Sequence, residues 1–304
     1  MRILICSDGM DPEDKPVRLA GLLAAPCAAA ATLLGIAELS QEEKPLRDAL
    51  ESEAEKLRSV GVEPEIVLRT GEPIREILHQ TTAQMYDLTI IGARRKGTTG
   101  LYWRAEKTYE VIKAIPSPVM LATGRCETLR SFVVCTGGKK FIDAAVQLTG
   151  KVAAAVGASV TLLHVMAEPP AIYADLVRLE EDVEHLLESG SELGRNLLSQ
   201  KQSLERLGVA TEVRVRHGLV LNQVFAEVNE RNHDLIVAGS SPTRGPLGHY
   251  IMGDLTRSIV NRANVPVLVA RAEKTTESGR PSFWSTLKQI FASSRDPGRK
   301  TTAS

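Results

Sequence analysis

The chain has 304 residues, 43% of them hydrophobic and 24% charged, which is typical of a globular protein and sufficient for two domains. Its 37 basic and 37 acidic side chains cancel, so the composition predicts no nucleic-acid partner. No apolar run is long enough to span a bilayer and the chain begins with a strand pattern, so we expect a cytoplasmic protein with no transmembrane segment. Cys6, Cys27, Cys126 and Cys135 lack metal-ligand spacing and are expected to be small core residues in a reducing compartment.

Strand and helix patterns alternate through the first 124 residues. The strands are continuous apolar runs, which indicates burial on both faces. Such alternation predicts a parallel sheet with helices on both sides, joined by right-handed crossovers. The expected strands are 2–7, 31–37, 63–69, 87–92 and 118–122, and the expected helices are 14–28, 43–60, 72–85 and 104–115.

The rest of the chain repeats this pattern. Phe132–Cys135 matches Ile3–Cys6 at an offset of 129, whereas Gly208 matches Gly61 at an offset of 147, so the second copy carries an insertion of 18 residues. We predict a first domain over 1–124, a linker over 125–130, and a second domain over 131–271 with a helical insertion at 173–190. The apolar edges 117–122 and 265–270 need covering, and we predict that they pack against each other within the chain.

Two segments allow alternative interpretations. Apolar residues between Leu176 and Leu207 follow a roughly heptad rhythm that is interrupted at Gly190. They could form a seam for a partner helix, or two amphipathic helices that pack on their own sheet, which we favour. Residues 272–304 are polar and predict a disordered tail, in which 283–291 has one apolar face and could dock on a protein surface.

The stretch from Asp234 to Asp254 is the most informative for function. A buried-strand pattern leads into a glycine-rich loop and then into the start of a helix. Glycines let backbone N–H groups approach a ligand, and a helix N-terminus favours an anion, so the pattern suits a phosphate group. A degraded copy begins at Asp87. In doubly wound sheets, ligands bind beyond the carboxyl ends of the strands, where 136–138 would face 239–254, and 7–9 would face 92–106.

The repeat, the glycine loop, and the last strands after Pro116-Ser-Pro118 and Val265-Pro266 together resemble the universal stress protein family, in its tandem form, over residues 1–271. The resemblance implies an α/β fold of two tandem doubly wound domains, each with a five-stranded parallel sheet of the adenine nucleotide alpha hydrolase-like type. It also implies frequent dimerisation through the last strand. In one branch it implies ATP binding, with an Asp at the end of the first strand and a loop of Gly, two residues, Gly, nine residues, Gly and Ser or Thr.

Each copy keeps part of that motif. The first keeps Asp8 and Gly92, but Glu106 replaces the final hydroxyl residue. The second keeps Gly239 and Gly253, but its loop is one residue longer and Asp254 replaces the hydroxyl residue. The residues that could surround ATP, with Mg²⁺ as a companion ion, are Thr136, Gly137, Gly138, Val165, Gly239, Ser240, Thr243, Gly253 and Asp254 in the second domain, and Asp8 and Gly92 in the first.

Two of these residues also have structural interpretations. Asp254 could cap its own helix and so occupy the place of a phosphate. Asp8 could accept a hydrogen bond from adenine or ribose, or simply form a turn before Gly9. We find no paired nucleophile and base, and expect no enzyme. The sequence predicts a stress-responsive regulatory protein that binds an adenine nucleotide in its second domain. The alternative is a nucleotide-free module of the same fold that dimerises or docks a protein partner.

Overall fold

The computed structural model describes most of the chain up to Arg271. The predicted tail, with its segment 283–291, and the first part of the insertion lie outside the described residues. Residues 1–273 form one compact unit. The described residues are 1–10, 13–92, 105–137, 143–167, 183–242, 250–251 and 253–271.

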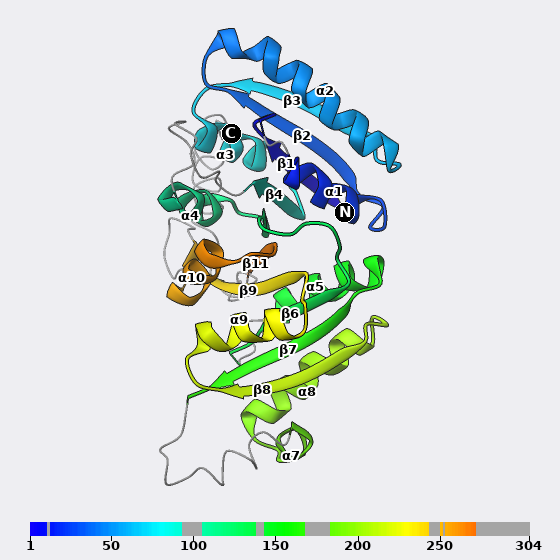
Figure 1. Ribbon diagram of the computed structural model, residues 1–304, viewed down its shortest axis with the longest axis vertical. Coiled ribbons are helices and arrows are strands. Elements are labelled where there is room, and N and C mark those ends of the chain that lie inside the picture. The colour runs from blue at the N-terminus through cyan, green and yellow to red at the C-terminus, as the bar shows by residue number, and fades with distance from the viewer. Residues whose placement is uncertain are drawn as a thin grey trace, which may run out of the picture. The chain divides into compact units, whose positions relative to one another are not determined.

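The first repeat contains every strand and helix that its sequence predicts (Figure 1). Helix α1 ends four residues earlier than expected, because Pro26 has no N–H to continue the helix. The strands are β1 (Arg2–Ser7), β2 (Ala30–Ala37), β3 (Pro64–Thr70), β4 (Leu88–Gly92) and β5 (Val119–Ala122). The helices are α1 (Lys15–Ala24), the short 3-10 helix η1 (Ser40–Glu42), α2 (Glu43–Ser59), α3 (Pro73–Ala83) and α4 (Ala105–Ala114).

The second repeat follows the same order and adds a short strand and an extra helix. Its strands are β6 (Ser131–Cys135), β7 (Ser159–Met166), β8 (Thr211–His217), β9 (Leu235–Pro242), β10 (Tyr250–Ile251) and β11 (Val267–Arg271). Its helices are α5 (Asp143–Val156), α7 (Val183–Glu188), α8 (Glu192–Glu205), α9 (Val220–Glu230) and α10 (Asp254–Arg262).

The described part of the heptad-like region, residues 183–207, packs on its own sheet, as the favoured interpretation predicts. Gly190 adopts a left-handed φ of 63° between α7 and α8, and the Ser191 hydroxyl caps α8 by accepting from the Gly194 N–H at 3.0 Å. Leu197 and Leu204 of α8 are fully buried in the main core. These leucines therefore belong to the domain's own packing and not to a partner seam.

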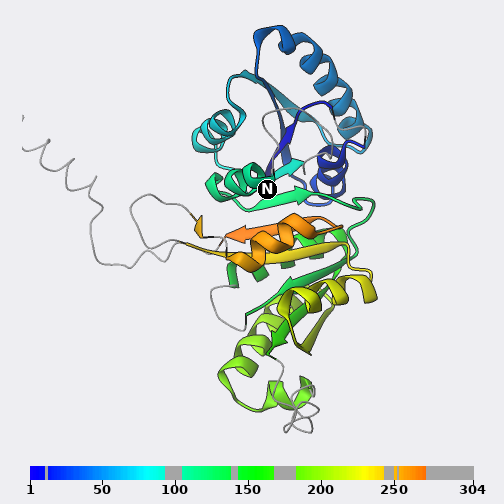
Figure 2. The same cartoon turned by 60° about the vertical axis from the view of Figure 1, so that its left-hand side comes forward.

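The two repeats share one sheet, in the order β3-β2-β1-β4-β5-β11-β9-β6-β7-β8. Along this order, neighbouring strands of the same repeat are parallel, and the short β10, which lies off this path, pairs antiparallel with β9. At the seam β5 and β11 pair antiparallel, with Met120 opposite Leu268 (Figure 2). The prediction that the last strands cover each other is thus confirmed. Each repeat supplies the edge that the other needs, which explains why both lie in one compact unit.

A hydrophobic core lies on each face of this sheet. Along β1, Ile3 and Ile5 belong to one core and Leu4 and Cys6 to the other, which explains the uninterrupted apolar strands. Helices α1, α2, α5 and α8 cover the first face, and α3, α4, α9 and α10 the second (Figure 1). Desolvation raises the pKa of the Cys6 and Cys135 thiols to about 12. Both thiols therefore stay protonated. Cys6 and Cys126 are buried core residues as predicted, whereas Cys27 and Cys135 are only half-buried.

Side chains also join the repeats at the seam. Arg271, at the end of β11, is only 7% exposed and donates to the carbonyl oxygens of Ile112, Ile115 and Ser117, where α4 ends. Arg257 of α10 lies over the Tyr109 ring of α4, 5.1 Å from its centre. The Arg271 hydrogen bonds place a cation at the negative end of the α4 dipole.

Candidate functional site

The crevice predicted for the second repeat lies where β6 and β9 part. Their ladder ends at the pair Val134–Val237, and the next helices leave β6 and β9 toward opposite faces of the sheet. In the first repeat the corresponding ladder runs one pair further, to Cys6–Ile91. The sheet therefore opens one residue pair earlier in the second repeat. This is the switch point at which doubly wound sheets bind ligands.

The β6 side of the crevice is formed by Thr136, Gly137 and Val165. Thr136 is buried, and its hydroxyl donates to Gln200 Oε1 at 3.2 Å. Gly137 follows as an exposed residue, and Val165 is a half-buried residue of β7. Gly138 lies outside the described residues. Sequence reasoning missed Gln200, although the offset of 147 aligns it with Glu53, a polar residue at the same place in a helix.

The β9 side differs from the sequence prediction. The strand does not end at Gly239 but continues to Pro242, because β10 pairs with it antiparallel, Ile251 opposite Ser241. Ser240 is therefore a strand residue, in register with Arg271, and Thr243 lies outside the described residues. A two-residue partner strand leaves no periodic signal in the sequence.

The start of α10 is also shifted by one residue from the prediction. Gly253, and not Asp254, occupies the N-cap position. Asp254 is the first helical residue and is exposed, so the prediction that Asp254 is the N-cap was wrong, whereas its place in the first turn still complements the helix dipole. The Thr256 hydroxyl donates to the Gly239 carbonyl at 3.2 Å. The structure thus brings Gly239 and the N-terminus of α10 together, as a phosphate site requires.

The glycines of the second crevice are not required by the fold. Gly253 has a φ of −62°, which any residue can adopt, and Gly137 has no left-handed φ either. A Cβ atom added at either residue would meet no described atom within 4 Å. Within the described part of the chain, neither backbone conformation nor packing accounts for these two glycines.

The glycines and the aspartate of the first crevice have local structural roles. Gly9 has a φ of +64°, and a Cβ there would lie 2.6 Å from Ala49 Cβ of α2. A Cβ on Gly92 would lie 3.3 Å from Pro16. Asp8 is exposed and accepts from the Met10 N–H at 3.0 Å, which is the turn interpretation. The structure therefore explains these residues without a ligand.

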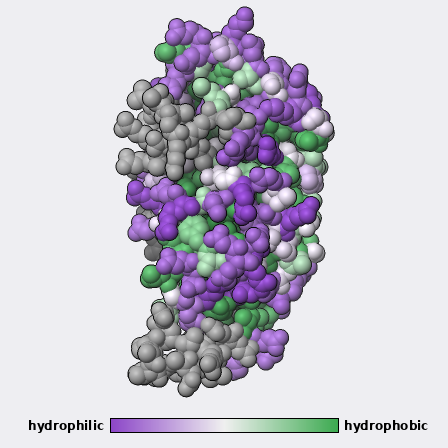
Figure 3. Space-filling view, viewed as in Figure 1, coloured by the Kyte–Doolittle hydropathy of each residue, from purple (hydrophilic) through white to green (hydrophobic). Residues whose placement is uncertain are grey.

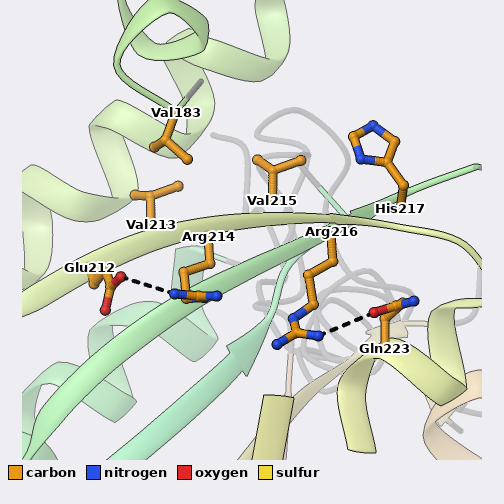
Figure 4. Close-up of a pocket in the computed structure, with 8 residues that line it drawn as sticks. All are labelled: Val183, Glu212, Val213, Arg214, Val215, Arg216, His217 and Gln223. Carbon is orange, nitrogen blue, oxygen red and sulfur yellow. Dashed lines mark hydrogen bonds and ion pairs between the residues drawn. The ribbon is translucent and has the colours of Figure 1, made fainter. Parts of the chain in front are cut away.

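A separate cavity of about 550 Å³ lies along β8, at the opposite edge of the second repeat's sheet. Val213, Val215 and His217 point to one side of the strand, and Arg214 and Arg216 to the other (Figure 4). Both arginines are paired with the buried carboxylate of Glu227, at 3.1 and 2.7 Å. Glu212 and Glu230 supply further carboxylates to Arg214 and Arg216, so these cations are already neutralised, and no predicted site residue lines the cavity.

The universal stress protein family model matches this sequence twice, over residues 1–122 and 128–271. The chain belongs to the universal stress protein family. As a tandem member, it is similar along most of its length to solved structures of that family. One from Archaeoglobus fulgidus covers 89% of this chain and 98% of its own, with a TM-score of 0.65 and 17% identity.

Two structures from Pseudomonas aeruginosa give similar values. A putative universal stress protein covers 89% of this chain and 93% of its own, with a TM-score of 0.63 and 14% identity. A protein described as functionally unknown covers 96% of this chain and 97% of its own, with the same TM-score and identity. At these identities the likeness concerns the fold. No curated protein sequence is significantly similar to this universal stress protein.

The described residues lack two further features, a metal-binding cluster and a membrane-spanning helix. They contain no cluster of three or more His, Cys, Asp or Glu side chains that could hold a metal ion. None of their helices combines the length and the apolar character needed to cross a bilayer. On the face shown in Figure 3, hydrophilic residues predominate and apolar residues reach the surface in separate areas.

Proposed function

We propose that this tandem universal stress protein is a regulatory protein whose second repeat binds an adenine nucleotide, ATP, while the first repeat is a structural partner. The observation that supports this division is the difference between the glycines of the two crevices. Gly9 and Gly92 have packing partners that account for them, whereas a Cβ atom at Gly137 or Gly253 would meet none of the described atoms within 4 Å. A glycine that the fold does not need leaves room for a ligand to approach the backbone closely.

The second crevice offers suitable groups for each part of ATP. Thr136, Gly137 and Val165 would lie beside the adenosine. Gly239, Ser240 and Gly253, with the N-terminus of α10, would lie beside the phosphates, where unpaired N–H groups and the helix dipole favour an anion. Asp254 places a carboxylate at the same point. This carboxylate would repel the phosphates, unless Mg²⁺, a hard cation that prefers oxygen ligands, lay between them.

The first test is mass spectrometry of small molecules released when the purified full-length protein is denatured, followed by calorimetry with ATP and Mg²⁺. The informative variant is Gly253→Val. Because the backbone conformation and the free space at this residue accept a side chain, the variant should fold normally and lose ATP binding. The matched control is Ala105→Val, at the corresponding position of α4, which should change little. Equal loss of binding in both variants would contradict the assignment to the second repeat.

If no nucleotide is released and ATP does not bind, the alternative of a nucleotide-free docking module takes its place. The structure restricts that alternative. The family's dimerisation strand is already occupied, because β5 and β11 pair with each other. A partner of the nucleotide-free module would have to bind elsewhere.

A further inference from the structure

The first repeat buries a carboxyl group that has too few partners for a charge. Glu53 of α2 is only 3% exposed. Its Oε1 accepts from the Ser7 hydroxyl at 2.7 Å, whereas its Oε2 is buried and has no hydrogen-bond partner among the described residues. A buried carboxylate with a single donor is costly, because one hydrogen bond does not replace its hydration.

The surrounding charges oppose ionisation of Glu53. The charged groups that face it are Asp8 beyond the end of β1, Asp14 before α1, and Lys56 on α2 itself. Lys56 is already paired with Asp14. The pKa of Glu53 is raised to about 7, chiefly by burial and also by Asp14 and Asp8, against the opposing effects of the Ser7 hydrogen bond and Lys56. The protein's buried Glu227 contrasts with this, since two arginines contact it.

The second repeat contains the same arrangement with an uncharged amide in place of the carboxyl group. The offsets of 129 and 147 align Ser7 with Thr136, Asp14 with Asp143, and Glu53 with Gln200. Gln200 is also buried. Its Oε1 accepts from the Thr136 hydroxyl at 3.2 Å, and its Nε2 donates to Asp143 Oδ1 at 3.5 Å. A protonated glutamic acid has this same pattern of one acceptor and one donor.

We propose that the first repeat senses pH through Glu53, whose protonated form ties the end of β1 and the start of α1 to α2. With its proton, Glu53 can accept from Ser7 and donate toward Asp14, as Gln200 does between Thr136 and Asp143. Without its proton, an unpartnered anion faces Asp8 and Asp14, and their repulsion loosens the start of α1. This inference concerns the first repeat and is independent of nucleotide binding in the second.

The test is hydrogen–deuterium exchange of the full-length protein, corrected for the intrinsic effect of pH on exchange. Helix α5, beside Gln200, is an internal control for α1 in the same sample. With a pKa of about 7, the protonated fraction falls about tenfold between about pH 6 and pH 8. Protection of α1 (Lys15–Ala24) should therefore fall by about tenfold over this range, while protection of α5 (Asp143–Val156) should stay constant.

Two substitution variants complete the test. Glu53→Gln should abolish the pH response of α1, and Gln200→Glu should create a similar response in α5. The second variant remains informative even if the first does not fold. A wild-type protein in which α1 and α5 respond equally, or a Glu53→Gln variant that keeps the wild-type response, would overturn the proposal.

Discussion

Replacing Arg271 by methionine should destabilise the whole unit, because this side chain joins the two repeats. The guanidinium donates to three carbonyl oxygens at the end of α4, including those of Ser117 at 3.2 Å and Ile115 at 2.9 Å. Methionine keeps most of the apolar stem and leaves these buried acceptors without a donor. Hydrogen bonds from a charged group contribute about 1.5–3 kcal/mol each, but they are not additive. We therefore expect a loss of about 3–5 kcal/mol in the free energy of unfolding.

The assay is urea denaturation followed by circular dichroism, supported by thermal unfolding. For a chain of this size the loss corresponds to a melting temperature lower by about 10 °C. The matched control is Arg257→Met, which makes the same replacement at the same seam. Arg257 is exposed, and its contact with the Tyr109 ring should contribute only about 0.5–1 kcal/mol. If Arg271→Met lowers the free energy of unfolding no more than Arg257→Met does, the buried hydrogen bonds of Arg271 do not hold the repeats together.

Three further variants test separate parts of the structure. Asp254→Ser should raise ATP affinity about tenfold in calorimetry, because it removes a negative charge beside the phosphates, whereas weaker binding would assign Asp254 to Mg²⁺. Burial raises the pKa of Glu53 from 4.5 to about 7. The free energy of unfolding of the wild type should therefore fall as pH rises through this window. In urea denaturation, the Glu53→Gln variant should be as stable as the wild type near pH 4.5 and more stable by about 3 kcal/mol near pH 8. Parallel curves of stability against pH for the two proteins would contradict this. Gly124→Ala should lower the melting temperature more than Gly61→Ala, since both have a positive φ but only a Cβ at 124 would overlap the Asn264 carbonyl; equal losses would show that backbone strain alone matters.

The order of strands and helices in the described residues could be predicted from the sequence. Continuous apolar runs such as Ile3–Cys6 identify strands buried on both faces, and the repeat supplies a second, independent reading of each element. The pairing of the last strands could also be predicted, because an apolar edge such as Val119–Ala122 has to be covered. Short stretches of chain determine these properties, because the period of their apolar residues reflects the geometry of the element.

Only the tertiary structure decided which side chains meet and which glycines the fold requires. The Ser7–Glu53 and Thr136–Gln200 contacts join residues 46 and 64 positions apart, and Arg271 reaches a carbonyl 159 positions away. Gly9 and Gly253 look alike in the sequence, yet a Cβ would collide with α2 at the first and meet no described atom within 4 Å at the second. Such contacts depend on how distant elements pack against each other, which no local pattern encodes. The sequence thus determined the family and the architecture, while long-range packing determined the difference between the two crevices.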